Sequence, residues 1–206
     1  MQDQTIGAFL EQLGARVPAP GGGAAAALCA AQGAALLEMV ARYSTGARYA
    51  ENADLIASII EQAEAVRVEA LRLAQEDARA FGVVSESYKM PKGTEEEKRL
   101  RAEAISEASV EAAEPPAGVI ILVDKLLRPA KQLLEVGNRS VITDVAAAAE
   151  TMRAAAAMAR VNIEVNMGMV ADQGESVRLL SSITRVDTIL RAAEAITEAV
   201  RKEIAQ

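Results

Sequence analysis

A triple glycine opens directly into an alanine-rich segment near the start of the chain, in the stretch Val17-Pro18-Ala19-Pro20-Gly21-Gly22-Gly23-Ala24. Glycine frees the backbone from the usual steric limits and alanine has the highest helix propensity, so we expect a loop that leads into a helix. The first amide groups of that helix lack intrahelical partners and carry a partial positive charge. The loop is therefore either a pocket wall for an anionic or carbonyl-bearing ligand, or a tight turn that lets two helices approach closely.

The composition favours an all-α protein. Aromatic residues make up only 2% of the chain and alanine occurs in long runs, which disfavours sheet packing and favours helices that approach closely. With 206 residues and 51% hydrophobic content, the chain can bury one substantial core. We expect a single domain over residues 1–206.

Several classes of function are disfavoured by what the sequence lacks. The formal charge is −7 and no basic cluster is interleaved with aromatics, so we expect no nucleic-acid partner. No run of eighteen uninterrupted apolar residues and no leader pattern is present, and we therefore expect a cytoplasmic protein with no membrane contact. The lone Cys29 allows neither an internal disulfide nor a thiolate metal cage, and we expect it to be a small buried hydrophobe.

The chain contains no histidine. This removes the usual general base, the usual zinc ligand and the common nucleophile-activating dyads. Any catalysis must therefore depend on carboxylates, lysine, tyrosine or backbone dipoles. We expect no metal ion and no cofactor.

Capping signals and apolar spacing divide the chain into helices. Thr5 and Gly14 bound a first short helix, and Thr94 with Glu97 forms a capping box that starts another. Pro115 and Pro116 suggest a further boundary, with Pro129 inside the helix that follows as a kink. Four expected helices have both ends defined and cover residues 5–13, 22–43, 141–170 and 176–204. Two long helices are expected to start at residue 52 or 53 and at residue 94, and another is expected to run from residue 115 or 116 to 136.

The last expected helix carries a narrow apolar seam that ends at Ile204. Its members recur at helical spacing and are Leu179, Ile183, Val186, Leu190, Ala193, Val200 and Ile204. Such a seam usually faces another long helix. Together with the alanine-rich faces, it leads us to expect a homodimer.

Asp77 interrupts an apolar stripe and is the first candidate for chemistry. The stripe consists of Leu55, Ile59, Ala63, Val66, Ala70 and Leu73, and Asp77 occupies its next position. A carboxylate at such a position either faces a ligand or is paired in the interior, here with Arg72, Arg79 or another cation.

Asp144 is the second candidate, although an aspartate in the first turn of a helix is often only a cap or a dipole partner. Thr143 is an alternative cap that would leave Asp144 available. Asn162 and Asn166 share one helix face, where they would hydrogen-bond across a helix interface or to a polar ligand. Asp144 and Asn162 are separated by roughly 27 Å of helix, so they cannot both contact one small reacting centre within a subunit.

A compact basic feature lies next to a turn, where Tyr88 is followed by Lys89 and Lys92. Lysines in such a place are ordinarily solvated. The alternative is that they bind a ligand.

Taken together, several motifs resemble those of the cyclodeaminase/cyclohydrolase family, which comprises the C-terminal domain of formiminotransferase-cyclodeaminase and free-standing methenyltetrahydrofolate cyclohydrolases. Their order along nearly the whole chain is specific, whereas each alone is weak. The motifs are Phe9-Leu10, Pro18 to Gly23, Glu76 to Phe81, Tyr88 to Lys98, Gly137-Asn138, Thr143 to Val145 and Asn162 to Asn166.

The resemblance implies a dimeric long-helix bundle of the cyclodeaminase-domain type that binds a tetrahydrofolate near the subunit interface. It places the loop from Gly21 to Gly23 against the pterin or the reacting bridge, and Asp77 and Asp144 at the reaction centre. It implies substrate binding by Tyr88, Lys92 and Asn162, with Lys92 a candidate for the anionic tail of the folate. Where the family commonly has a lysine-rich segment ending in tyrosine, this chain has only Arg48 to supply positive charge before Tyr49.

Two directions of one-carbon chemistry fit a site without histidine or metal, because both need a carboxylate that tolerates a developing amidinium charge. We favour a methenyltetrahydrofolate cyclohydrolase, since a formiminotransferase domain is not part of this sequence. A formiminotetrahydrofolate cyclodeaminase, working with a separate formiminotransferase, is the alternative. A non-catalytic helical dimer that binds a folate or a partner protein is the alternative from a different class.

Overall fold

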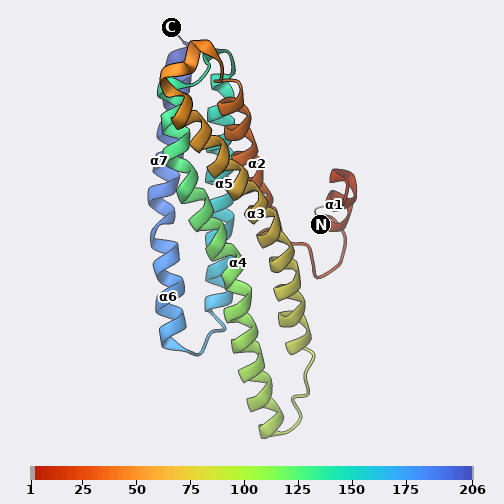
Figure 1. Ribbon diagram of the computed structural model, residues 1–206. Coiled ribbons are helices and arrows are strands. Elements are labelled where there is room, and N and C mark those ends of the chain that lie inside the picture. Colours follow the sequence, from red (N-terminus) through yellow and green to blue (C-terminus); the bar gives the residue numbers. More distant parts are fainter. Residues whose placement is uncertain (1–2, 206) are drawn as a thin grey trace.

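The computed structural model describes residues 3–205, which form helices and connecting turns without any strand. The helices form an elongated bundle in which α3 and α4 extend as a hairpin beyond the other helices (Figure 1). The short α1 lies to one side of the bundle. The elements are α1 (Ile6–Leu13), α2 (Gly22–Arg42), η1 (Ala47–Asn52), α3 (Ala53–Ser87), α4 (Glu95–Val136), η2 (Arg139–Val141), α5 (Ile142–Met167), α6 (Gln173–Thr184) and α7 (Val186–Ile204).

The predicted helix caps are largely confirmed. Thr5 Oγ1 accepts a hydrogen bond from the Ala8 amide at 3.1 Å, and α1 ends at Gly14. At the start of α4, Thr94 and Glu97 form the reciprocal capping box, with Thr94 Oγ1 accepting from the Glu97 amide at 3.1 Å. Thr143 does not cap α5, because that helix begins at Ile142.

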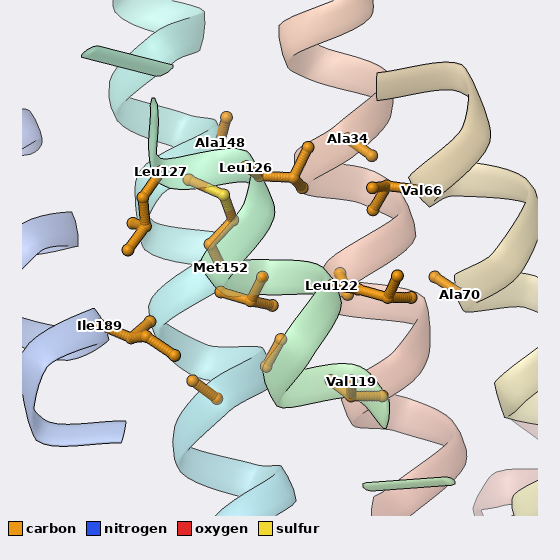
Figure 2. Packing of buried hydrophobic residues seen from close by; sticks show 14 of the residues in the cluster. Ala34, Val66, Ala70, Val119, Leu122, Leu126, Leu127, Ala148, Met152 and Ile189 are labelled. Carbon is orange, nitrogen blue, oxygen red and sulfur yellow. The ribbon is translucent and has the colours of Figure 1, made fainter. Parts of the chain in front are cut away.

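Small side chains bring α2 against its neighbours in the core. A Cβ atom on Gly33 would lie 2.9 Å from Thr151 Oγ1 and 3.0 Å from Met152 Cγ, so the contact between α2 and α5 requires glycine there. Aliphatic side chains from the six helices α2 to α7 fill the core. Figure 2 shows part of this packing around Leu126 and Met152. Alanine and glycine therefore replace the bulk that aromatic residues supply in other cores.

α2 is also long and apolar enough to cross a membrane by length and composition. However, 61% of its most apolar stretch is buried within the bundle, which is typical of a central core helix.

The stripe that leads to Asp77 faces the core as predicted. Ile59, Ala63 and Leu73 are buried along α3, and Asp77 follows them as a half-buried carboxylate. The α3 bounds agree with the expected start at residue 52 or 53.

The predicted boundary at Pro115 and Pro116 is wrong. α4 continues without a break from Glu95 to Val136, with both prolines and Pro129 inside the helix. Proline removes one backbone hydrogen bond and costs about 3 kcal/mol in a helix interior. All three rings are buried in the structure, and their packing against the neighbouring helices offsets that loss.

The predicted helix over residues 176–204 is wrong as a single element, because it divides at Arg185 into α6 and α7. Its apolar seam also does not face a second copy. Leu179, Val186 and Ala193 belong to the core that this chain itself forms, and of the seven seam residues only Ile204 is strongly exposed.

Candidate functional site

The start of α2 meets α3 and α5 at a corner of the bundle. A Cβ atom on Gly23 would collide with the carboxylate of Asp77, and a Cβ atom on Gly22 would lie 3.3 Å from Asn162 Nδ2. Among residues 3–205, no atom lies within 4 Å of the corresponding position on Gly21. The structure therefore brings Gly22, Gly23, Asp77 and Asn162 together, and the triple glycine is a place of close approach as well as a loop.

Asp77 has no cation partner in the described part of the chain. The two arginines proposed as partners bind other carboxylates: Arg72 pairs with Glu69 and Glu76, and Arg79 lies 3.7 Å from Glu111. Burial raises the pKa of Asp77 from 3.8 to about 6, and the backbone amide of Ala24 opposes that rise in part. The interpretation of Asp77 as one half of an interior ion pair is thus excluded, and its charge is available to a ligand.

The N-terminus of α2 has no side-chain cap, since its N-cap residue is Gly21. The amide groups of its first turn therefore present a partial positive charge next to the Asp77 carboxylate. This charge favours the ionised form of Asp77, but desolvation is the larger of the two effects.

In the described part of the chain, the side chains of Asn162 and Asn166 form no hydrogen bond to another helix and none to each other. Asn162 Nδ2 donates to the carbonyl of Met158 at 2.8 Å, and Asn166 Nδ2 donates to the carbonyl of Asn162 at 3.0 Å. Both donors thus bond to the backbone of their own helix. Within residues 3–205, their side-chain oxygens receive no hydrogen bond, which leaves two acceptors at the corner.

A cavity of about 350 Å³ lies between α3, α4 and the end of α5. Phe81 lies one helical turn beyond Asp77, and Asn166 lies one turn beyond Asn162, so the cavity begins about one helical turn from the corner. The lining residues are Phe81, Val84, Ser85, Tyr88, Ser109, Val165, Asn166 and Met169.

A second cavity, of about 360 Å³, separates α1 from α2 and α3. Phe9 is the one buried residue of α1 and lines this cavity together with Leu71 and Cys29. Cys29 is half-buried rather than buried, which corrects the expectation from the sequence. Partial burial raises the pKa of its thiol.

Two predicted site residues lie at the opposite end of the bundle from Asp77. Asp144 is half-buried in the first turn of α5, eighteen residues before Asn162 and therefore roughly 27 Å from it along the helix. Arg48 is exposed in η1, with its guanidinium 5.8 Å from the ring centre of Tyr49. Within one chain, neither residue reaches the corner.

The same end of the bundle is held together by Asn138. Its backbone N–H donates to Ser44 Oγ at 2.8 Å, and its side-chain Nδ2 donates to the carbonyl of Tyr43 at 2.9 Å. These hydrogen bonds join the turn before α5, which carries Asp144 in its first turn, to the residues that follow α2 and precede Arg48 in η1.

The remaining predicted residues lie at the far end of the α3–α4 hairpin. Tyr88 lines the cavity and is 44% exposed, and Lys92 is exposed in the turn that follows. Lys89 pairs with Glu86 at 2.5 Å, and both side chains are exposed.

Sequence reasoning missed Arg101, which lies against Tyr88. Its Nη2 and Nε donate to the Tyr88 carbonyl at 3.1 and 3.3 Å, and its guanidinium is 5.3 Å from the Tyr88 ring centre. The two residues are thirteen positions apart, on helices joined by a turn. No motif indicates this contact, because it depends on how the α3–α4 hairpin closes.

No metal site is evident in the part of the chain that the structure describes. In residues 3–205, no three His, Cys, Asp or Glu side chains are placed to hold a metal ion. The chemical groups at the corner are one carboxylate, two amide oxygens and the amide groups of a helix start.

Comparison with known proteins identifies relatives along the whole chain. The family model for formiminotransferase-cyclodeaminase matches residues 5–185. The methenyltetrahydrofolate cyclohydrolase of Methylorubrum extorquens is 31% identical over 203 residues, covering 98% of this chain and 96% of the relative. The formimidoyltransferase-cyclodeaminase of Gallus gallus is 32% identical over 182 residues, covering 88% of this chain but only 34% of the relative.

A solved structure has the same fold from end to end. The crystal structure of formiminotetrahydrofolate cyclodeaminase from Thermotoga maritima matches with a TM-score of 0.86 and 25% sequence identity, covering 98% of each chain.

Proposed function

The chain belongs to the formiminotransferase-cyclodeaminase family, and from that premise we propose that it is a methenyltetrahydrofolate cyclohydrolase. It would hydrolyse 5,10-methenyltetrahydrofolate to 10-formyltetrahydrofolate. The full-length similarity to a cyclohydrolase favours this reaction among those of the family. The observation that carries the proposal is the half-buried carboxylate of Asp77, which has no cation partner in residues 3–205 and lies beside a glycine loop.

The substrate carries a delocalised positive charge on the carbon that bridges N5 and N10. An unpaired carboxylate in a partly desolvated corner attracts such a charge more strongly than one in water. Gly22 and Gly23 leave room for the planar ring system to approach the backbone, and the amide oxygen of Asn162 is available to accept a hydrogen bond from it.

Asp77 would also move the protons. A water molecule attacks the bridging carbon and gives one proton to the Asp77 carboxylate, which forms a neutral carbinolamine. The carbon–N5 bond then breaks, N5 takes a proton from Asp77, and the remaining hydroxyl proton is released as the formyl group forms on N10. One water is consumed and one proton is released overall. A pKa of about 6 suits a group that both accepts and returns a proton near neutral pH.

The alternative is the cyclodeaminase reaction, which the similarity to formimidoyltransferase-cyclodeaminases and to the Thermotoga maritima enzyme favours. There, N10 attacks the formimino carbon attached to N5, and the protonated adduct expels ammonia to leave the methenyl bridge. The same carboxylate would stabilise the same cation. A separate formiminotransferase would then supply the substrate.

A second copy of this chain would bring Asp144 to the reaction centre. Several uncharged side chains lie on the outer sides of α2 and α5 and at the end of α2, among them exposed Tyr43, Val161 and Val165 and half-buried Met39 and Met158. α2 starts next to Asn162, whereas its end and the start of α5 are joined through Asn138. A twofold axis across this face would place the Asp144 end of one copy opposite the Asp77 corner of the other, and would bring Arg48 to the same place.

This interface differs from the seam that the sequence suggested, because that seam is buried within the chain. The family and the shared reaction centre also lead us to propose a cytoplasmic homodimer that needs no cofactor beyond its folate substrate.

One experiment separates the two reactions. Purified protein is mixed with 5,10-methenyltetrahydrofolate while the loss of the methenyl absorbance is followed, and ammonia is assayed in parallel with 5-formiminotetrahydrofolate. Loss of the methenyl absorbance without ammonia release from the formimino compound supports the cyclohydrolase, and ammonia release supports the cyclodeaminase. Asp77→Asn serves as the blank in both assays, and turnover of neither compound would refute both reactions.

A further inference from the structure

The cavity near Asp77 lies beyond the first residue of α2, where that helix does not fill the space between α3 and α5. α2 begins at Gly22, level with Asp77, whereas α3 continues for ten further residues to Ser87. Figure 1 shows the α3–α4 hairpin extending past the start of α2. The cavity of about 350 Å³ is lined by α3, α4 and the end of α5, from Phe81, one helical turn past Asp77, to Tyr88 at the end of α3.

The lining of the cavity suits a flat, uncharged group. The whole chain has two phenylalanines and three tyrosines, and one of each, Phe81 and Tyr88, lies in this lining. Their side chains are 46% and 44% exposed, so they present ring surface to whatever enters. The polar members are Ser85, Ser109 and Asn166, and no charged residue lines the cavity. Aromatic rings stack well on such walls.

One arginine, Arg101, lies just outside the lining at the end of the cavity distant from Asp77, against Tyr88. The Arg101 guanidinium lies over the Tyr88 ring and is held by the Tyr88 carbonyl, so its orientation is fixed before a ligand arrives. In residues 3–205, no carboxylate lies within 4.0 Å of Arg101, in contrast to Arg99 on the same helix, which pairs with Glu96 and Glu103. Arginine with a free edge is well suited to bind a carboxylate with two hydrogen bonds.

We propose that this cavity binds the p-aminobenzoyl part of the folate substrate, and that Arg101 binds a carboxylate of its glutamate. The inference rests on the proposed function and assigns a place to the half of the substrate that does not react. Phe81 lies one turn from Asp77, and Tyr88 lies about 16 Å from Asp77 along α3. The aromatic ring, the amide and the glutamate would follow the helix in that order. Lys92, which the sequence suggested for the anionic tail, lies further out in the turn.

Substrates with and without glutamate test the charged end. Arg101→Gln should raise KM for 5,10-methenyltetrahydrofolate about tenfold and leave kcat unchanged, because the charge-assisted hydrogen bonds to the glutamate carboxylate are lost far from the reacting carbon. With 5,10-methenyltetrahydropteroate, which lacks the glutamate, the same variant should have the KM of the wild type. An equal rise in KM for both substrates, or none for either, would overturn the assignment of Arg101.

The aromatic wall should behave differently. Phe81→Ala should raise KM for both substrates, since both carry the benzoyl ring. Arg99→Gln and Leu100→Ala are matched controls: Arg99 lies on the same helix and is already paired, and Leu100 is 44% exposed and does not line the cavity. Both controls should have wild-type KM values. Melting curves of all four variants check that the hairpin stays folded.

Fragment binding decides the question even if neither folate is turned over. Ligand-observed NMR should show that p-aminobenzoyl-L-glutamate binds to the wild type and binds more weakly to Arg101→Gln. p-Aminobenzoate, which lacks the glutamate, should bind weakly to the wild type and to Arg101→Gln alike. Binding of the glutamate fragment in the absence of turnover would support the cavity while refuting the proposed reaction. Turnover together with equal fragment binding by the wild type, Arg101→Gln and Phe81→Ala would refute the assignment of the cavity but leave the proposed reaction standing.

Discussion

The carboxylate of Asp77 occupies the space in which any other residue at position 23 would carry its Cβ atom. Gly23 is therefore the residue that allows α2 and α3 to meet with a charged group between them. This contact joins the two sequence features that stood out separately, the triple glycine and the interrupted apolar stripe. It also explains how a carboxylate comes to be half-buried with no arginine or lysine paired to it among residues 3–205.

The three glycines should differ in their tolerance of a side chain. Gly23→Ala should lower kcat about a hundredfold, because its methyl group displaces the Asp77 carboxylate from the reacting carbon. Gly22→Val should mainly weaken folate binding by displacing the Asn162 amide and filling the approach to the loop. Gly21→Ala should be close to wild type, since no atom lies within 4 Å of its Cβ position. Steady-state kinetics, folate titration and thermal midpoints distinguish these outcomes.

If Gly21→Ala lost as much activity as Gly23→Ala, the triple glycine would be explained by the backbone conformations that glycine allows. The close approach of the Asp77 carboxylate to Gly23 would then not be the reason for it. A large loss of stability in Gly22→Val with unchanged folate affinity would return that glycine to a purely structural role.

Asp77→Asn should fold normally and lose most of its turnover. The amide keeps the shape of the side chain but removes the charge that stabilises the cationic bridge and the group that carries protons, a loss of about 10²–10⁴ in rate. Stopped assays on both the methenyl and the formimino substrates measure it, with circular dichroism to verify the fold. Wild-type rates on both substrates would mean that Asp77 is not catalytic.

The same carboxylate predicts how stability and activity depend on pH. Burial raises the pKa of Asp77 from 3.8 in the unfolded chain to about 6 in the folded protein. Between these pH values the folded state binds more protons, so the contribution of Asp77 to the free energy of unfolding falls as the pH rises from 3.8 to about 6. Above that range the charge destabilises the fold, on the order of 1–3 kcal/mol.

Asp77→Asn should therefore be more stable than the wild type at pH 7, and the difference should vanish at pH 3.5 or below. Chemical denaturation at several pH values measures this difference. In the wild type, kcat/KM should also fall below about pH 6, where the base becomes protonated. A difference in stability that is constant over the whole range would show that the pKa of Asp77 is not raised in the folded protein.

Local signals predicted the helices where local chemistry determines them. The Thr94 capping box and the apolar spacing before Asp77 specify where α4 starts and which face of α3 is buried, and the structure agrees on both. Pro115 and Pro116 misled because tertiary packing overrides the local cost of proline when the rings are buried between helices. The division at Arg185 has no comparable signal, since α6 and α7 follow each other without a proline or glycine.

The candidate site could be predicted in part. Asp77 stood out because it interrupts an apolar pattern, and the glycines stood out by composition. Their contact could not be derived, because it depends on how α2 lies across α3. Arg101 was missed for the same reason: its neighbour Tyr88 is on the other arm of a hairpin, and the sequence gives no periodicity between the two arms.

Two inactive variants should restore activity when they are mixed, provided that the site is shared between copies. Asp144 lies roughly 27 Å along α5 from Asn162, so it can act at the Asp77 corner only from a second chain. Asp77→Asn and Asp144→Asn should each be inactive as pure dimers, whereas a mixed dimer contains one site with both carboxylates intact. Unfolding and refolding the mixture allows subunits to exchange, and at most about a quarter of wild-type activity should return with random pairing.

A charge in the shared face provides the matching structural test. Met158→Glu should produce inactive monomers in sedimentation velocity, because it places a carboxylate among the apolar side chains proposed to meet between copies. Val177→Glu on the exposed face of α6 should stay dimeric and active. A wild-type protein that sediments as a fully active monomer would rule out the shared site. Asp144 would then have only a structural role in the first turn of α5.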